Sequence, residues 1–451
     1  MTLNAEFRRY CWLELTPHRL IAAPLIAGLI LALVAASSNQ SAAVLATTGL
    51  AGFAACALLY GGYLAMNAMP EEMRERTWDF QRMSAQMPAQ LAFGKVFGAP
   101  VVGWYAGAWF LAAYLLAGLQ AHGFDAVLIA AAAVFGTLTL HAAALTLGVF
   151  AARAGATRNP GAMFAFLLIW VASVPLQWFA GNRSDGLMWW GVNLPYLWFV
   201  LLSSMVFAAW AWLGAVRTFA SELRVRQVPW AWVAFSLFLG VWAGGLLEAR
   251  AGTAVNRALI VMLITFLTTG TGAYVLLLSE RTGAMTLARV LRTLRGELDG
   301  GVTRALQSLP LWSVSLAAAW LAALVLLLMP WSTGLGAQLT GLLADLSSEG
   351  RAMPLALAAM LLRDAGIYCI FALQRFPRRP GVAAMLYIAL LDGVFPALMS
   401  VAGLSTVAFL VFPLGRASAL GALVIFLVQA AAAWSLALWR WREGQRLDLT
   451  A

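Results

Sequence analysis

Three ionisable side chains interrupt apolar stretches in the second half of the sequence. Arg363 and Asp364 lie within MLLRDAGIYCIF, and Asp392 lies within IALLDGVFPAL. A charge at the depth of a membrane helix is costly unless it faces protein or water, so these residues are candidates for proton or ion coupling. Adjacent residues on a helix point about 100° apart, which predicts that Arg363 and Asp364 do not pair and that one of them reaches Asp392. Structural ion pairs between helices, or a position at the membrane interface, are the alternatives.

Other residues that could do chemistry are sparse. His141 stands alone in the uncharged run 126–152, where a lone histidine is more often a hydrogen-bonded packing residue than a ligand. Cys11, Cys56 and Cys369 lack the spacing of a disulfide framework or a zinc site. Neither paired carboxylates nor a nucleophile motif nor an acidic metal cluster is evident. The sequence therefore predicts no catalytic residues, no bound metal and no enzyme activity of its own.

The composition is typical of a polytopic membrane protein. Of the 451 residues, 62% are hydrophobic and 11% are charged, and the mean hydropathy is +0.82. These values lie far from those of soluble globular domains. Uncharged windows of about 20 residues, enough to cross a bilayer core about 30 Å thick, recur along the chain. Because lipid tolerates no unpaired backbone groups and the alternating pattern of a barrel is absent, we expect an all-α fold.

We predict about twelve membrane-spanning helices, with both termini in the cytoplasm. The expected spans are 20–37, 43–66, 97–119, 126–152, 162–180, 196–216, 229–247, 258–279, 308–330, 354–374, 382–400 and 417–439. Most of the 29 lysine and arginine residues cluster in alternate loops, which the positive-inside rule places in the cytoplasm. The net charge of +10 is thus a topology signal, and we expect no nucleic-acid partner.

The chain reads as two six-helix repeats in the same orientation. The expected halves are 1–228 and 229–451, and the longest charged loops, 67–96 and 279–309, join the second and third helices of each half. The tripeptide Glu-Arg-Thr occurs in both loops, beginning at Glu75 and at Glu280. Matching topology together with this recurrence predicts a duplicated plan.

Both charged loops have amphipathic patterns. Met73, Phe80, Met83 and Met87 have the spacing of one helical face, which predicts a helix along the membrane surface. In the second loop the apolar stripe is Leu287, Val290, Leu291, Leu294 and Leu298, with Arg289, Arg292 and Arg295 on another face. Such helices either extend their arginines toward lipid phosphates or dock a cytoplasmic partner. Two equivalent loops favour docking to a partner that is itself two-fold.

The first loop also resembles a known family. PEEMRERTWDFQRMSAQMPAQLAFGK (70–95) is similar to the loop after the second helix of ABC transporter permeases of the type-2 exporter (ABC-2) family. There an acidic and basic run precedes a Thr, a short helix follows, and a Gly-Lys opens the third helix. The matching positions are Glu71, Glu72, Glu75, Arg76, Thr77, Trp78, Gly94 and Lys95. The family commonly has glycine where Arg76 stands, and the resemblance is strongest over residues 60–120.

This resemblance implies a membrane-spanning subunit whose cytoplasmic loops sit in clefts of two ATPase subunits. The ATPase-coupling residues it implies are Glu71, Glu72, Arg74, Glu75, Arg76, Thr77 and Trp78 in the first loop and Glu280, Arg281, Thr282, Arg289 and Arg292 in the second. Because the chain lacks a GxxxxGK[ST] motif, ATP and Mg are expected in two copies of a separate cytoplasmic ABC ATPase, with no cofactor bound here. Membrane lipids are further neighbours, and an additional membrane or periplasmic subunit is left open.

The family also has a re-entrant hairpin near the outer face before the sixth helix of each half. In this chain the corresponding stretches are 181–199 and 392–415. An ordinary outer loop with a belt of Trp189, Trp190 and Trp198 is the alternative for the first of them.

A secondary transporter of the major facilitator type is the main alternative, because it too has twelve helices in two halves. The sequence Glu280-Arg281-Thr282-Gly283 loosely resembles that superfamily's loop motif, and Arg363, Asp364 and Asp392 would suit proton coupling. An integral membrane enzyme or scaffold is a third reading. The cargo is expected to be hydrophobic or amphipathic and to move outward. A single lysine against 28 arginines and abundant alanine suggest a bacterium of high GC content, and so a cytoplasmic (inner) membrane protein.

Overall fold

The computed structural model describes residues 4–38, 41–84, 86–153, 186–251, 257–279, 292, 301–329, 351–373, 380–414 and 418–448. It forms two compact units, Met1–Leu187 with Asn193–Gln227, and Met188–Val192 with Val228–Ala451. The change of unit after Gln227 falls beside the boundary expected between the two halves. That the units are copies of one plan stays a prediction, and each is described by itself.

The described residues contain ten helices that are long and apolar enough to cross a membrane. A shorter apolar helix occupies Trp230–Leu246. The chain is therefore a helical, multi-pass membrane protein, as the composition indicates. The expected span at 162–180 lies outside the described residues. The total of twelve spans and the cytoplasmic position of both termini stay predictions.

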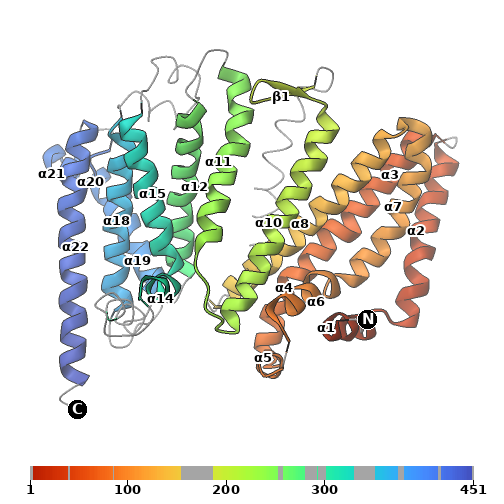
Figure 1. Cartoon of the computed structure of the whole chain (residues 1–451), viewed down its shortest axis with the longest axis horizontal. Coiled ribbons are helices and arrows are strands. Elements are labelled where there is room, and N and C mark those ends of the chain that lie inside the picture. Colours follow the sequence, from red (N-terminus) through yellow and green to blue (C-terminus); the bar gives the residue numbers. More distant parts are fainter. Residues whose placement is uncertain are drawn as a thin grey trace. The chain divides into compact units, whose positions relative to one another are not determined.

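The first unit is a bundle of long helices with three short helices at one end (Figure 1). The long helices are α2 (Pro17–Ser37), α3 (Ala42–Phe53) continuing through the π-helix η1 (Ala54–Tyr60) into α4 (Gly61–Arg74), α7 (Val101–His122), α8 (Asp125–Arg153) and α10 (Tyr196–Glu222). The short helices are α1 (Ala5–Glu14), α5 (Trp78–Arg82) and α6 (Pro88–Gly98). The predicted loop 67–96 therefore contains the end of α4, all of α5 and most of α6.

One face of α2 is apolar and exposed along its whole length. Ile21, Leu25, Leu29 and Leu33 follow one another at intervals of four residues, and each is between 61% and 65% exposed. Residues four apart lie on the same side of a helix. A soluble protein rarely exposes an apolar stripe of this length, whereas lipid tails cover it without cost.

Glycines let the long helices of this unit approach closely. A Cβ atom on Gly49 of α3 would lie 2.7 Å from the backbone nitrogen of Tyr114 in α7. On Gly148 of α8 it would lie 2.1 Å from the carbonyl oxygen of Met66 in α4. Small residues at such crossings are the usual means by which membrane helices pack, because dispersion contacts replace the hydrophobic effect there.

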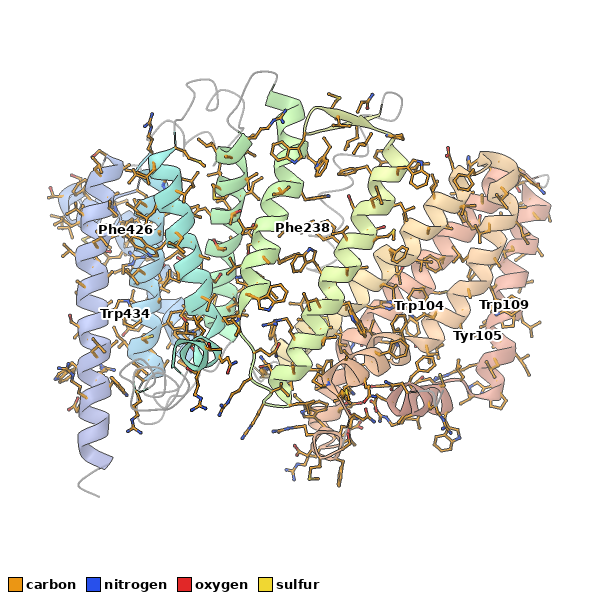
Figure 2. All side chains as sticks on the ribbon, viewed as in Figure 1. Trp104, Tyr105, Trp109, Phe238, Phe426 and Trp434 are labelled. Carbon is orange, nitrogen blue, oxygen red and sulfur yellow. The ribbon has the colours of Figure 1, made fainter. Side chains whose placement is uncertain are left out.

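His141 of α8 is completely buried against the π-helix. Its Nε2 lies 2.8 Å from the carbonyl oxygen of Ala57, and because a carbonyl only accepts, Nε2 carries the proton. The ring packs edge-on to Trp104 of α7, with centroids 5.3 Å apart; Figure 2 labels Trp104. The histidine is therefore a hydrogen-bonded packing residue, as its isolation in the sequence suggests.

The second unit is also a set of long helices. It contains α11 (Trp230–Ala251), α12 (Arg257–Ser279), α14 (Gly301–Ser308), α15 (Leu311–Leu328), α18 (Met353–Ala372), α19 (Pro380–Ala389), the π-helix η2 (Leu390–Val394), α20 (Phe395–Val401), α21 (Ser405–Val411) and α22 (Ala419–Asp448). Helix α18 packs most extensively on α22, and α12 packs on α15. The short helices α20 and α21 pack on each other across Gly403, whose φ of 76° reverses the chain. This is a helical hairpin within 392–415.

The other predicted hairpin region differs. Strands β1 (Leu187–Trp189) and β2 (Val192–Leu194) form a β-hairpin, with Trp190 and Gly191 at φ 50° and 78° in its two-residue turn. Positive φ at both turn residues suits the twist of a hairpin. Trp189 Nε1 donates to the carbonyl of Trp242 at 3.0 Å, and Trp190 Nε1 donates to that of Val241 at 3.1 Å. The described part of 181–199 before α10 is thus a β-hairpin rather than a helical one, and residues 181–185 lie outside the described residues.

Candidate functional site

The segment 70–95, which carries the family resemblance, is not one amphipathic helix. Helix α4 ends at Arg74, α5 occupies only Trp78–Arg82, and α6 begins at Pro88. The prediction that Met73, Phe80, Met83 and Met87 share one helical face is therefore wrong. The helix is interrupted because Arg76 adopts a left-handed conformation, with φ of 60°, and because proline cannot continue a preceding turn.

Arg76 closes the end of α4. The backbone N–H of Thr77 donates to the carbonyl of Glu72 at 3.0 Å, and that of Arg76 donates to the carbonyl of Met73 at 3.4 Å. This pair of bonds is a Schellman motif, whose left-handed residue is usually glycine. Arg76 is also the position at which the ABC-2 loop commonly has glycine. Arg224 at the end of α10 is a second example, with φ of 57° and the bond from Val225 N–H to Ala220 at 2.8 Å.

A charged network lies directly behind this turn, between α1, α4 and α6. Lys95 Nζ donates to Glu6 Oε1 at 3.1 Å and also contacts Glu72. Arg9 donates to Glu6 at 2.7 Å and to Glu72, and the hydroxyl of Tyr10 donates to Glu72 at 2.9 Å. Two cations thus balance two carboxylates. Burial, followed by the charge of Glu72, raises the pKa of Tyr10 well above its ordinary value, so the hydroxyl stays a donor.

Lys95 is the single lysine of the sequence, and its side chain is 0% exposed. The neighbouring glycines make room for α1. A Cβ atom on Gly94 would lie 2.4 Å from the Cβ of Glu6, and one on Gly98 would lie 2.8 Å from the ring of Tyr10. The two residues of the Gly-Lys pair therefore have different roles here. Gly94 leaves space for α1, and Lys95 balances the negative charge of Glu6 on that helix.

Trp78 anchors α5 to the bundle. The residue is 4% exposed, and its ring packs edge-on to Phe219 of α10, with centroids 5.9 Å apart. Lys95 Nζ lies 5.8 Å from the ring centroid, within the range of a cation–π contact. Trp78 and the buried cation of Lys95 therefore hold α5 against the bundle.

The outer side of α5 is exposed. We call the side chains of Asp79, Phe80, Arg82 and Met83 the tip. Phe80 is 74% exposed and Met83 is 76% exposed. The tip therefore combines two large exposed apolar side chains with two charged ones.

The predicted coupling residues divide into two groups. In the first loop Glu71, Arg74, Glu75 and Arg76 are exposed and Thr77 is half-buried, whereas Glu72 and Trp78 are buried. Buried side chains cannot touch a partner, so these two residues support the segment from within. In the second loop Glu280, Arg281, Thr282 and Arg289 lie outside the described residues. Arg292 is helical and exposed.

A second charged cluster lies in the middle of the second unit. Arg363 and Asp364 of α18 are buried, with 1% and 0% of their side chains exposed. The guanidinium of Arg363 contacts Asp392 of η2 at 2.6 Å and donates to Gln429 Oε1 of α22 at 3.1 Å. Tyr274 of α12 donates to Asp364. The prediction that one residue of the adjacent pair reaches Asp392 is confirmed.

The prediction that Arg363 and Asp364 do not pair is wrong. Arg363 Nε donates to Asp364 Oδ1 at 2.8 Å, and the terminal nitrogen contacts the same oxygen at 2.7 Å. The angle between neighbouring Cβ atoms limits short side chains, but arginine is long enough to return along the helix surface. Its guanidinium also lies over Phe426, 5.1 Å from the ring centroid, and Figure 2 labels this residue on α22.

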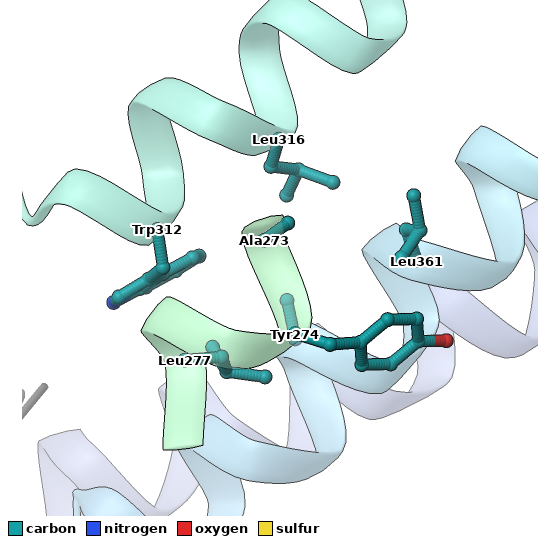
Figure 3. Close-up of a pocket in the computed structure, with 7 residues that line it drawn as sticks. Ala273, Tyr274, Leu277, Trp312, Leu316 and Leu361 are labelled. Carbon is teal, nitrogen blue, oxygen red and sulfur yellow. The ribbon is translucent and has the colours of Figure 1, made fainter. Parts of the chain in front are cut away.

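Figure 3 shows a small pocket beside this cluster, between α12, α15 and α18. Tyr274, Trp312 and Leu361 are among its lining residues, and the lining is almost wholly apolar. The ring of Tyr274 lines the pocket, whereas its hydroxyl bonds to Asp364. Tyr274 is therefore the connection between an apolar space and the buried charges.

Sequence reasoning missed several members of both clusters. The Lys95 network also includes Glu6, Arg9 and Tyr10, because α1 folds onto α6. The Arg363 cluster also includes Tyr274 and Gln429, because their helices pack on α18. A polar residue in an apolar helix was an available signal for Gln429. For Glu6 the signal was weaker, since a charge in a polar N-terminal stretch usually faces water.

Comparisons with protein-family models, with curated proteins and with solved structures find no match to this chain. The geometry of the two clusters and the pattern of the sequence are therefore the basis for a functional proposal.

Proposed function

We propose that this protein is the transmembrane permease subunit of an ATP-driven ABC exporter, with the tip on α5 as an ATPase-docking surface. The observation that carries the proposal is an exposed, mixed apolar and charged tip mounted on a buried support. Exposed Phe80 and Met83 form its surface, and Trp78 with the Lys95 network forms its base. The likeness of 70–95 to the coupling loop of ABC-2 permeases supports the same assignment.

The tip has the properties of an interface centre. Aromatic and methionine side chains are enriched at protein interfaces, and a few such residues commonly dominate the binding energy. The positive-inside pattern of the sequence supports a cytoplasmic position for this end of the unit, where an ATPase would be. Because α5 is held by buried contacts rather than by a free loop, movement of a bound partner would be transmitted to α4 and α6.

The docking role is assigned to the exposed residues Glu71, Arg74, Glu75, Arg76 and the tip. Glu72 and Trp78 are assigned to the support beneath them. By the same proposal, Glu280, Arg281, Thr282, Arg289 and Arg292 form the corresponding surface of the second loop. ATP and Mg are held by two copies of the partner ATPase, and a hydrophobic or amphipathic cargo leaves a bacterial cytoplasmic membrane.

The test is purification from native membranes in mild detergent, followed by identification of co-purifying proteins and assay of vanadate-sensitive ATP hydrolysis. We expect a nucleotide-binding subunit in a ratio of two per chain. A chain that purifies alone and leaves ATP hydrolysis unchanged would contradict the proposal.

A matched pair of variants locates the interface. Phe80→Ala should reduce recovery of the ATPase at least tenfold, because truncating an aromatic side chain at an interface centre commonly costs about 2 kcal/mol or more, and about 1.4 kcal/mol is tenfold. Trp12→Ala is the control, since Trp12 on α1 is 83% exposed but lies outside the tip. Equal recovery with both variants would remove the tip from the interface.

Proton-coupled secondary transport is a second candidate function, because one specific observation favours it. An arginine and two aspartates are in contact halfway along the membrane helices of the second unit. Such groups are rare in membrane spans and commonly lie on ion or proton pathways. Proton flux driven by substrate in proteoliposomes made with the chain alone would support this function, and flux only with ATPase present would exclude it.

A further inference from the structure

The charges around Arg363 do not balance if every group is ionised. In the part of the chain that the structure describes, the guanidinium of Arg363 is the cation in ion-pair contact with Asp364 and Asp392. One positive and two negative charges leave a net charge of −1 inside the helices. An unpaired charge at such depth is strongly unfavourable, and in practice a buried carboxylate relieves it by taking up a proton.

The two carboxyl groups differ in how well their ionised forms are satisfied. Both oxygens of Asp364 accept hydrogen bonds, Oδ1 from Arg363 at 2.8 Å and Oδ2 from the hydroxyl of Tyr274. Asp392 receives a bond only at Oδ2, from Arg363 at 2.6 Å. Its Oδ1 is buried and has no hydrogen-bond partner among the described residues. A carboxylate whose second oxygen lacks a donor is the poorer place for the negative charge.

Among the described residues, Arg363 is the charged side chain in ion-pair contact with Asp392. The other groups of the cluster are neutral: Tyr274 of α12 bonds to Asp364, and Gln429 and Phe426 of α22 contact Arg363. The side chain of Asp392 is 18% exposed, whereas that of Asp364 is 0% exposed. Asp392 is therefore the more exposed carboxyl group of this cluster.

We infer that Asp392 is a proton-binding site, with the proton on Oδ1 and Asp364 retained as the permanent counter-ion of Arg363. This inference deepens the second candidate function by assigning its proton to one atom. Loss of the proton leaves Asp392 to compete with Asp364 for the guanidinium. Binding of the proton weakens the contact between Arg363 and Asp392 Oδ2, so that the guanidinium is held by Asp364 and Gln429.

The site has a structural connection to the helical hairpin. Gln429, which accepts from Arg363, donates through Nε2 to the carbonyls of Leu410 and Val411 at 2.6 and 3.1 Å. Leu410 and Val411 are the last residues of α21, so their carbonyls have no N–H partner within the helix. The amide of Gln429 supplies a donor instead. A shift of the guanidinium toward or away from Gln429 therefore changes the support of the α20–α21 hairpin.

The experiment is infrared difference spectroscopy of the purified full chain in detergent, between acidic and alkaline pH, reading the carbonyl stretch of protonated carboxyl groups. We expect a band in the wild type that both Asp392→Asn and Asp364→Asn abolish, because each variant leaves a single carboxylate to balance the guanidinium of Arg363. A wild type without this band, or a band that survives in either variant, would overturn the inference.

A second measurement on the unmodified chain covers the case in which a variant does not fold. A hydrophobic carbodiimide reacts with protonated carboxyl groups in apolar surroundings, and mass spectrometry locates the adduct. We expect modification of Asp392, decreasing as the pH rises, and none of Asp364; the reverse pattern would overturn the inference. Proton binding without proton flux in proteoliposomes would keep this site and reject the second candidate function, so the two failures are distinguishable.

Discussion

Lys95 lies where α1, α4 and α6 meet, and its surroundings explain why a chain so rich in arginine has a lysine there. The ammonium group is a compact point charge that fits between Glu6 and Glu72 under the rings of Tyr10 and Trp78. A guanidinium is planar and larger, and it requires a fork of acceptors in one plane. Because the Lys95 side chain is fully enclosed, an arginine there requires the neighbouring side chains to shift.

We therefore predict that Lys95→Met lowers the free energy of unfolding by about 3–5 kcal/mol, because it leaves two buried carboxylates with one cation. Lys95→Arg should cost about 1–3 kcal/mol through overpacking. Thermal unfolding in detergent measures both. Arg74→Met is the control, since the Arg74 side chain is 64% exposed, and it should unfold within about 0.5 kcal/mol of the wild type. Equal behaviour of the variants at 74 and 95 would contradict a structural role for the network.

The individual charged residues show how far the sequence could be interpreted at this scale. Because a buried charge is energetically unfavourable, Arg363, Asp364 and Asp392 were expected to need oppositely charged partners. The structure shows such partners. The contact with Asp392 was predicted, but the pairing of Arg363 with Asp364 and the contacts with Tyr274 and Gln429 were not, because these depend on arginine's reach and on the packing of α12 and α22 against α18. The same limit applies to Lys95, whose partner Glu6 is far away in the sequence.

At the scale of elements, the end of α4 is the decisive feature of the coupling segment. Helical periodicity predicted one continuous surface helix, yet periodicity carries no information about a left-handed residue that is not glycine. Arg76 and Arg224 both hold this conformation at the end of a Schellman motif. A non-glycine residue there costs about 1–2 kcal/mol, so each position stores strain that glycine would relieve.

At position 76 the Arg76→Gly variant should therefore be more stable than the Arg76→Ala variant. This is the reverse of the order at an ordinary helical position. Both remove the charge, but only glycine relieves the backbone, so the glycine variant should be the more stable by up to about 1 kcal/mol after its larger unfolded-state entropy is subtracted. At Arg8 within α1, the glycine variant should instead be less stable than alanine by about 1 kcal/mol. Melting temperatures of the four proteins decide the point, and the same order at both positions would refute it.

The approach of α1 to α6 depends on Gly94. A methyl group there would lie 2.4 Å from the Cβ of Glu6. Because a Cβ atom is bonded directly to the backbone, side-chain rotation cannot relieve this contact. Gly94→Ala should displace α1 and increase the rate of trypsin cleavage after Arg8 and Arg9 in the folded protein.

Gly136→Ala is the matched control for Gly94→Ala. A Cβ atom on Gly136 in α8 would meet nothing within 4 Å, so alanine should stabilise the helix by roughly 0.5–1 kcal/mol. Unchanged cleavage with Gly94→Ala would mean that α1 is held elsewhere.

For the whole molecule, the apolar windows identified the long helices because lipid imposes length and hydropathy on each span. The expected spans that fall in described residues coincide with helices, and the second of them continues without a break through η1 into α4. Helix α1 was not foreseen, since a short amphipathic helix has no hydropathy signal. The β-hairpin at 187–194 was not foreseen either, because its alternation is too short to detect.

The orientation of the first unit in the membrane gives the last prediction, and the docking proposal depends on it. Ser84 lies next to the tip and His122 ends α7 after a full crossing; both are exposed. In a chain with Cys11, Cys56 and Cys369 replaced by alanine, Ser84→Cys should react with a membrane-impermeant maleimide only in inverted vesicles, because the positive-inside rule predicts that the arginine-rich loops face the cytoplasm. His122→Cys should react only in spheroplasts. The opposite pattern would place the tip outside and exclude an ATPase there, and labelling of both from one side would contradict the crossing by α7.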